Sequence, residues 1–241
     1  MKVILFIPRR YSIANMLTNG FEENGCEVKI ADYQAMMPKW YNKVYERTVG
    51  FPNRILKYFK PGYYESINDR YLDFILNEKP DLILIYNNQF FLPKTLEKIK
   101  DNCQIVFYLG DNPLWSKTFD YNLEILKYSD LTISPDSYWM NELSSIGMPN
   151  IVCDFIGYSS KIFFPVVKIS DKMKLKYQSD LLFIGRNYYD ASGFKRSLFM
   201  DSFEGLNLKI FGGKEWRKWF PSFSNLIMHF NLLESRISNE E

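Results

Sequence analysis

Short apolar runs alternate with amphipathic stretches along most of the chain. Lys2–Ile7 is a continuous apolar run of the kind that is buried on both faces of a parallel sheet. Five further short runs predict strands: Glu27–Ala31, Leu82–Tyr86, Gln104–Leu109, Leu131–Ser134 and Asn150–Phe155. Helical spacing between them predicts a first helix that Ser12 caps and Gly25 ends, and later helices around Tyr71–Leu76 and near residues 93–101, 118–128 and 136–146. This alternation predicts an α/β fold with a doubly wound parallel sheet.

The rhythm breaks after Gly157 and then restarts. Glycine, paired serines and a proline fill the break, which predicts a linker over residues 158–179. A second alternation follows, with strands at Asp180–Gly185 and Leu206–Phe211 and a helix over residues 190–204. We therefore expect one complete Rossmann-like domain over residues 1–157 and the start of a second over residues 180–241.

Composition and charge remove several classes of function. The 241 residues carry 30 Lys and Arg against 28 Asp and Glu, a net charge of +2, which argues against a nucleic-acid partner. Three scattered cysteines and the single His229 argue against structural zinc and a disulfide scaffold, so we expect no metal and a reducing cytoplasm. No apolar run approaches the roughly 18 residues of a membrane span.

Candidate functional residues follow the first and fourth predicted strands, because ligands gather at the carboxyl ends of strands in open α/β sheets. No glycine precedes Gly20, so the glycine fingerprint of a dinucleotide site is absent. Arg9 and Arg10 either meet an anionic group on an acceptor or belong to a solvated loop. Asp111, followed by Asn112, either accepts a proton from an acceptor hydroxyl as a catalytic base or caps its own turn.

The order of motifs between Val106 and Pro165 resembles the spore-maturation-protein-type glycosyltransferases. These are bacterial proteins of the GT-B fold, related to the broad group 1 glycosyl transferases. The matching elements are a D-x-P turn, a strand opened by Asp, a glycine that ends a helix, an F-x-P-like closure and the opening of a donor domain: Asp111–Pro113, Asp130–Ser134, Gly147, Phe163–Pro165 and Asp180–Arg186. Family members continue beyond the point that corresponds to Glu241, so we expect the second domain to be C-terminally incomplete.

The resemblance implies that the second domain binds a nucleotide diphosphate-sugar as donor, with no cofactor. Gly185 would let the backbone approach a phosphate, and Arg186 and Lys195 would neutralise the leaving diphosphate; the alternative is ordinary surface charge. Gly212 and Gly213 either give the nucleotide base close access or form a turn.

The function that the resemblance implies is metal-independent transfer of a sugar. The first domain would hold the acceptor, which is a glycan, lipid-linked or protein acceptor such as a cell-surface polysaccharide. The expected place is the bacterial cytoplasm, with peripheral contact at the inner membrane face. The alternative is a non-catalytic nucleotide- or partner-binding module, a truncated or split protein that a complementary chain completes.

The segment Lys39–Lys60 stands apart because basic and aromatic residues interleave in it. Six cations against Glu46 leave it a net charge of +5. This composition predicts contact with an anionic lipid head group or a phosphate-bearing acceptor. The alternatives are a nucleic-acid surface, which the predicted sheet gives little support, and an irregular connection whose aromatic side chains pack on the domain.

Overall fold

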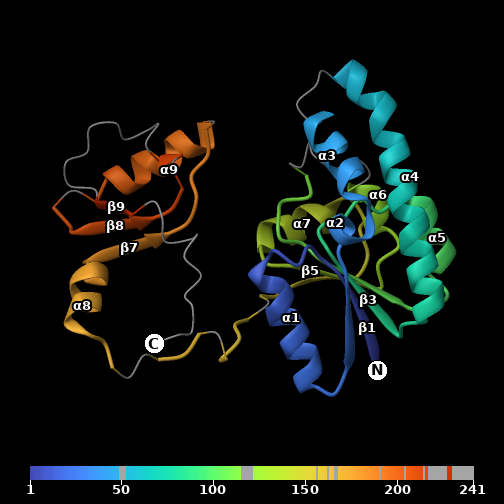
Figure 1. The fold of residues 1–241 in the computed structure, drawn as a ribbon, viewed down its shortest axis with the longest axis horizontal. Coiled ribbons are helices and arrows are strands. Elements are labelled where there is room, and N and C mark those ends of the chain that lie inside the picture. Colours follow the sequence, from blue (N-terminus) through green and yellow to red (C-terminus); the bar gives the residue numbers. More distant parts are fainter. Residues whose placement is uncertain are drawn as a thin grey trace. The chain divides into compact units, whose positions relative to one another are not determined.

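The computed structural model divides the chain into two compact units, Met1–Phe164 and Pro165–Glu241 (Figure 1). The residues that it describes are 1–48, 53–114, 122–155, 157–161, 163–165, 168–189, 191–203, 205–213, 215–216 and 227–229. At residues 53–57, 122 and 227–229 only the backbone is described.

The first unit is built on a six-stranded parallel sheet in the order β2-β1-β3-β4-β5-β6. Its strands are β1 (Lys2–Phe6), β2 (Glu27–Ala31), β3 (Leu82–Tyr86), β4 (Gln104–Tyr108), β5 (Leu131–Ser134) and β6 (Ile151–Cys153). All six strands and the parallel α/β architecture are thus as the sequence predicts.

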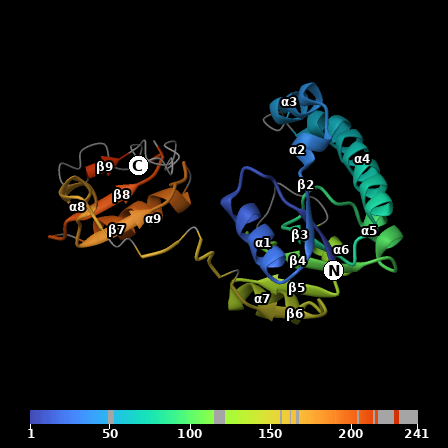
Figure 2. The same ribbon diagram turned by 60° about the horizontal axis from the view of Figure 1, so that its bottom comes forward.

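Helices cover both faces of this sheet, because the chain reverses direction across the sheet after β2. Right-handed crossovers then place α1 (Ser12–Glu23) on one face. On the other face lie α4 (Asn53–Glu78), α5 (Pro93–Ile99), α6 (Asn122–Leu126) and α7 (Ser137–Ser145). Alternate residues of β1 separate accordingly: Val3 and Leu5 pack with the α1 side, and Ile4 and Phe6 with the α4 side. Figure 2 shows α1 and α4 on opposite sides of the strands.

The sequence prediction for the start of the first helix is wrong, and so is the alternative that makes Lys39–Lys60 irregular, as far as its residues are described. Helix α1 begins at Ser12 itself, and Tyr11 is its N-cap residue without a side-chain cap. The segment after β2 is helical instead of irregular: α2 (Tyr33–Met36) and α3 (Lys39–Thr48) precede α4, which continues through Pro61. Within the described parts of the chain, no helix, the 26-residue α4 included, is long and apolar enough to cross a membrane.

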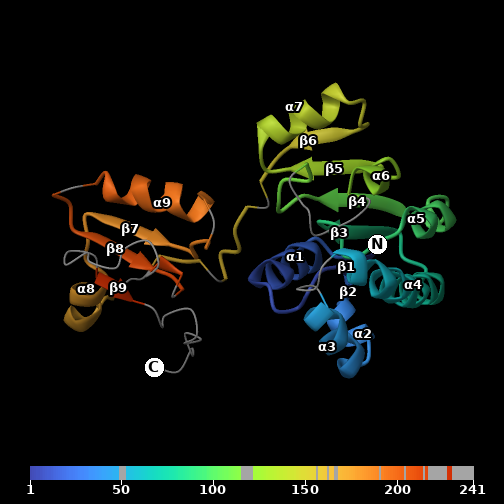
Figure 3. The same cartoon turned by 90° about the horizontal axis from the view of Figure 1, so that it is seen from above.

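The second unit has a three-stranded parallel sheet in the order β7-β8-β9 (Figure 3). Its elements are α8 (Asp171–Tyr177), β7 (Leu181–Ile184), α9 (Ala191–Asp201), β8 (Leu208–Phe211) and β9 (Ile227–His229). Buried Lys209 on β8 donates from Nζ to the carbonyls of Leu175 and Lys176 at 3.0 and 2.8 Å. These bonds attach α8 to the second sheet, although the sequence places α8 in a linker.

Three strands start with the same hydrogen-bonded pair. In each case the residue just before the strand is an aspartate, and its carboxylate accepts the backbone N–H of a residue at the start of the neighbouring strand. The backbone N–H of the aspartate donates back to the carbonyl of that same residue. The pairs are Asp81 with Lys2, Asp130 with Ile105 and Asp180 with Asn207, at N···Oδ2 distances of 2.6, 2.7 and 2.8 Å.

Candidate functional site

The carboxyl edge of the first sheet contains a topological switch point between β1 and β3. The connections from these adjacent strands lead to opposite sides of the sheet, which is where ligands bind in open α/β proteins. Tyr11, from the loop after β1, lies 6.1 Å from Tyr86 at the end of β3, measured between ring centroids. Tyr86 in turn stacks on Tyr108 of β4 at 5.9 Å. The ends of β1, β3 and β4 therefore meet in one group of tyrosines.

Asn87 holds the loop that carries Asp111. It adopts a left-handed backbone with φ of 57°, which Asn tolerates better than most residues. Its Oδ1 accepts the N–H groups of Gly110 and Asp111 at 2.6 and 3.1 Å, and its Nδ2 donates to Asp111 Oδ2 at 2.8 Å. Asp111 is exposed, and a residue of another loop fixes its carboxylate. The side-chain cap within the turn belongs to Asn112, whose Oδ1 accepts the N–H of Leu114 at 2.9 Å.

Gly110 is required by the tyrosine beneath it. A Cβ on this residue would lie 2.0 Å from the Tyr86 hydroxyl oxygen. Burial, and then the nearby charge of Asp111, raise the pKa of Tyr86 to about 12. Tyr86 is therefore a neutral phenol at physiological pH, placed under the loop that presents Asp111.

Arg9 and Arg10 lie at the same edge. The backbone N–H of Arg9 donates to Asp32 Oδ2 at 2.9 Å, which ties the loop after β1 to the end of β2. The guanidinium of Arg10 lies 5.3 Å from the ring centroid of Tyr11. A hydrogen bond with Tyr11 is the main cause that raises the pKa of Arg10, and Glu46 of α3 adds to it. Both arginines are exposed, and their contact with an acceptor stays a prediction.

In the second unit, Arg196 organises the end of β7. Its Nη1 donates to the carbonyl of Arg186 at 2.6 Å, and its guanidinium lies 4.8 Å from the ring centroid of Tyr188. Buried Asn187 donates to Ser197 Oγ at 2.9 Å and attaches the same loop to α9. The predicted cations Arg186 and Lys195 are both exposed. Sequence reasoning selected Lys195 and missed its neighbour Arg196.

Close neighbouring atoms leave no room for a side chain at Gly212 and Gly213 of the second unit. A Cβ on Gly212 would lie 2.2 Å from the carbonyl oxygen of Gly185, which also accepts the indole N–H of Trp216 at 3.0 Å. A Cβ on Gly213 would meet the carboxylate of Glu215. The close approach at Gly212 is therefore one of backbone to backbone, and access for a nucleotide base stays a prediction.

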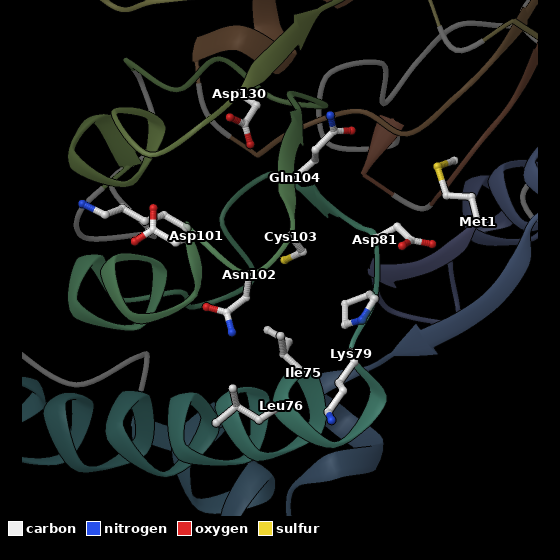
Figure 4. A pocket seen from close by; sticks show the side chains of 12 residues that line it. Met1, Ile75, Leu76, Lys79, Asp81, Asp101, Asn102, Cys103, Gln104 and Asp130 are labelled. Atoms are coloured by element: carbon white, nitrogen blue, oxygen red, sulfur yellow. The ribbon is translucent and has the colours of Figure 1, made fainter.

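A cavity of about 870 Å³ lies at the opposite, amino edge of the first sheet (Figure 4). Asp81 and Asp130 line it, but both are engaged in the strand-start pairs. Burial, with a smaller contribution from Asp130, raises the pKa of Cys103 in its wall to about 11, so the thiol is protonated and inert at neutral pH. No group of three or more His, Cys, Asp or Glu among the described residues could hold a metal ion. We therefore place the candidate chemistry at the carboxyl edge.

Comparison with known proteins gives a likeness in structure alone. No family model and no curated protein matches the sequence. Sucrose-phosphate synthase from Thermosynechococcus elongatus matches with a TM-score of 0.60 at 12% identity, over 95% of this chain and 70% of that one. An apo lipopolysaccharide outer core galactosyltransferase matches at 0.58 and 14%, over 95% and 68%. UDP-GlcNAc 2-epimerase from Neisseria meningitidis, bound to UDP-GlcNAc, matches at 0.57 and 13%, over 95% and 72%.

These neighbours confirm the predicted fold class. The chain has the GT-B-like α/β fold that glycosyltransferases and UDP-GlcNAc 2-epimerases share. At such low identity the likeness establishes the fold, so the more specific resemblance to the spore-maturation type stays a prediction.

Proposed function

We propose that this chain is a glycosyltransferase that moves a sugar from a nucleotide diphosphate donor to a hydroxyl-bearing acceptor. The observation that carries the proposal is the Asn87–Asp111 pair at the switch point of a GT-B-like unit, since this fold occurs in a galactosyltransferase and in an epimerase that binds the nucleotide sugar UDP-GlcNAc. The acceptor that we propose is a glycan, lipid-linked or protein acceptor on the route to a bacterial cell-surface glycan. The resemblance in sequence supports that setting and a cytoplasmic site of action.

On the acceptor side, Asp111 would act as the base. The acceptor hydroxyl oxygen attacks the anomeric carbon of the donor sugar, and the bond from that carbon to the phosphate oxygen breaks. The hydroxyl proton passes to the carboxylate of Asp111, and the nucleoside diphosphate leaves with the bonding electrons. The hydrogen bond from Asn87 Nδ2 keeps one carboxylate oxygen in place while the other accepts the proton.

On the donor side, the loop after β7 would receive the diphosphate. Arg186 and Lys195 supply positive charge, and the N-terminus of the 11-residue α9 adds the positive end of its dipole. The bond from Arg196 to the carbonyl of Arg186 sets the shape of this loop. Neutralisation by these cations would serve the leaving group without a metal ion.

Calorimetric titration of uridine and guanosine diphosphates into the full chain tests the donor side. We expect Arg186→Ala to weaken binding about tenfold or more, because a charge-assisted contact contributes roughly 1.5–3 kcal/mol. Lys172→Ala, which removes an exposed cation of α8, is the matched control. Equal binding by Arg186→Ala and wild type would contradict the phosphate assignment.

Product analysis by mass spectrometry tests the acceptor side. With nucleotide sugars and candidate acceptors, we expect transfer by wild type and its loss in Asp111→Asn, which keeps the shape and removes the base. Sugar transfer by Asp111→Asn at the wild-type level would show that Asp111 is not the base. A change of sugar configuration without transfer would instead indicate an epimerase.

One observation favours the alternative of a non-catalytic binding module. Leu182 and Ile184 on β7 are 44% and 65% exposed, and among the described residues β7 pairs with β8 alone. An exposed apolar edge strand of this kind suits pairing with another polypeptide, as a complementary chain would provide. Nucleotide binding without turnover under all donor and acceptor combinations would support this alternative.

A further inference from the structure

Helices α3 and α4 form a hairpin that extends past the carboxyl edge of the first sheet. The 26 residues of α4 span about 39 Å, whereas a five-residue strand spans about 16 Å. Asn68, in the middle of α4, donates to the carbonyl of Phe90 and accepts from the N–H of Leu92, at 2.8 and 2.9 Å, in the loop after β3. The part of α4 that precedes Tyr63 therefore lies beyond that loop, together with α3 (Figures 1 and 2).

Buried contacts fix α3 on α4. Tyr45 of α3 stacks on Tyr63 of α4 with ring centroids 3.9 Å apart. The Tyr63 hydroxyl donates to Asn42 Oδ1 at 2.8 Å, and Asn42 Nδ2 donates to the carbonyl of Gln34 at 2.9 Å. Since Gln34 also donates its backbone N–H to Asp32 at 2.9 Å, the hairpin is held to the carboxyl edge of the sheet.

The outer side of this hairpin combines cations with large apolar side chains. We define the α3–α4 face by its exposed charged and large apolar members, which are Lys39, Trp40, Lys43, Val44, Glu46 and Arg47 of α3 and Tyr58 and Phe59 of α4. The three cations recur every four residues, so they form one stripe along α3. Trp40 and Val44, also four residues apart, run beside that stripe, and the indole of Trp40 is 67% exposed.

The aromatic residues of the two helices are neighbours. Trp40 stacks on Tyr41 at 5.2 Å between centroids, and the Tyr41 hydroxyl lies 3.6 Å from the place that a Cβ on Gly62 would occupy. Tyr58 lies one helical turn before Gly62, on the same side of α4. The aromatic residues therefore continue from α3 onto α4 as one surface.

The sequence around this surface is more basic than the rest of the chain, and the α3–α4 face itself holds Lys39, Lys43 and Arg47 against Glu46. The stretch from Lys39 to Lys60 carries +5, while the whole chain carries +2, so the remaining residues carry −3. Positive charge beside exposed Trp, Tyr and Phe is the combination that suits the interface of an anionic bilayer, where the aromatic rings enter the head-group region and the cations meet lipid phosphates. The exposed apolar side chains of Trp40, Val44 and Phe59 beside these cations favour an anionic lipid surface as the occupant.

We propose that the α3–α4 face binds the surface of an anionic lipid bilayer. The hairpin lies beyond the same edge that carries Asn87 and Asp111, so binding there brings this edge near the lipid head groups. If the proposed function holds, this placement suits an acceptor that a membrane lipid carries; the binding itself does not depend on that function.

Vesicle sedimentation with the full chain tests the proposal. We expect wild type to bind vesicles of phosphatidylcholine mixed with phosphatidylglycerol at low salt, with weaker binding at high salt and little binding to phosphatidylcholine alone. Each cation near an anionic surface contributes roughly fivefold in partitioning, so Lys43→Gln with Arg47→Gln should weaken binding about 25-fold. The matched control, Lys98→Gln with Lys127→Gln, removes two exposed cations outside the hairpin and should bind like wild type. Trp40→Ala should weaken binding even at low salt.

Three outcomes would overturn the proposal. The first is that wild type binds no vesicles, and the second is that it binds neutral and anionic vesicles equally. The third is that the Lys43/Arg47 variant and the Lys98/Lys127 control lose the same amount of vesicle binding. Retention on a single-stranded oligonucleotide without binding to anionic vesicles would assign the face to nucleic acid instead. Circular dichroism checks that each variant is folded, and nucleotide titration in parallel separates failure of this surface from failure of the proposed function.

Discussion

Removing the side chain of Asn87 should loosen the loop that presents Asp111. The side chain makes two hydrogen bonds to backbone N–H groups and one to the carboxylate of Asp111. A net contribution of about 0.5–1 kcal/mol for each of the three bonds, the low end of the usual range because the site is partly exposed, gives a loss of about 1.5–3 kcal/mol for Asn87→Gly. Asn87→Ala should lose about 1 kcal/mol more, since φ of 57° strains a residue that has a Cβ.

Asn150 supplies the matched control for these variants. Asn150 is exposed and adopts φ of 52°. Asn150→Gly and Asn150→Ala therefore have the same backbone effects but remove no hydrogen bond to the loop that carries Asp111. The excess loss in the Asn87 variants over the Asn150 variants then measures the side-chain hydrogen bonds. Urea unfolding followed by circular dichroism gives the free energies.

A local readout is needed because a chain of two units need not unfold in one step. Amide hydrogen exchange at Gly110 and Asp111 reports the loop directly, and both amides should exchange faster in Asn87→Gly than in wild type. The Asn87 variants could lose no more stability than the Asn150 variants, or exchange at these two amides could be unchanged. Either result would mean that the Asn87 side chain does not hold the loop and does not position Asp111.

Two further substitutions test packing and charge. Gly212→Ala should destabilise the second unit by about 1–3 kcal/mol in urea unfolding, because its Cβ would lie 2.2 Å from the carbonyl oxygen of Gly185; an unchanged transition would contradict this contact. Hydrogen bonds from Lys2 and then from Lys29 lower the pKa of Glu78. The contribution of the ionised Glu78 to folding stability is therefore complete above the ordinary pKa of 4.5, and it is lost as pH falls through the lowered pKa. Melting temperatures across this acidic range should fall less steeply in Glu78→Gln, and parallel curves would argue against the pairing.

The fold was accessible from the sequence because short strand-like runs alternate with amphipathic helices along the first unit, even though β2 and β5 include polar residues. The site was accessible only in part. Asp111 could be placed at the end of β4 from sequence, but its partner Asn87 depends on the register that sets Tyr86 beside Tyr108. No local pattern encodes that register. The available signal was an Asn directly after a predicted strand, where Asn tolerates a left-handed backbone, and it is a weak one.

The other differences also have physical causes. Lys195 and Arg196 are neighbours in sequence, yet one step along a helix turns a side chain by about 100°, so only the rotation of α9 decides which cation meets the end of β7. The composition of Lys39–Lys60 left open whether this segment is an irregular connection. In the structure α3 and α4 cover its described residues, and α4 continues through Pro61, which lies at an exposed position although proline removes a helical hydrogen bond.

The strand-start aspartates yield a final prediction that concerns the fold itself. Asp130 Oδ2 accepts the N–H of Ile105 at 2.7 Å, and the backbone N–H of Asp130 donates to the carbonyl of Ile105 at 2.8 Å. Asp130→Ala removes the first bond and keeps the second, so we expect a loss of about 1–2 kcal/mol in urea unfolding. Asp130→Asn retains an acceptor and should lose less. Asp101→Ala is the control, because Asp101 is exposed and lines the same cavity.

The thiol of Cys103 provides a second readout that a general loss of stability would not imitate. Burial is the main cause that raises its pKa to about 11, and the negative charge of Asp130 adds to it. Asp130→Ala and Asp130→Asn should therefore both lower the pKa of this thiol while leaving it above the ordinary value of 9.0, and alkylation rates measured against pH would reveal the shift. The two effects of Asp130 can then be separated. Its hydrogen bond affects the free energy of unfolding, and its charge affects the pKa of Cys103. Equal stability of Asp130→Ala and Asp101→Ala, with an unshifted thiol, would mean that the carboxylate of Asp130 faces solvent and that the recurring Asp-Leu strand start has no part in joining neighbouring strands.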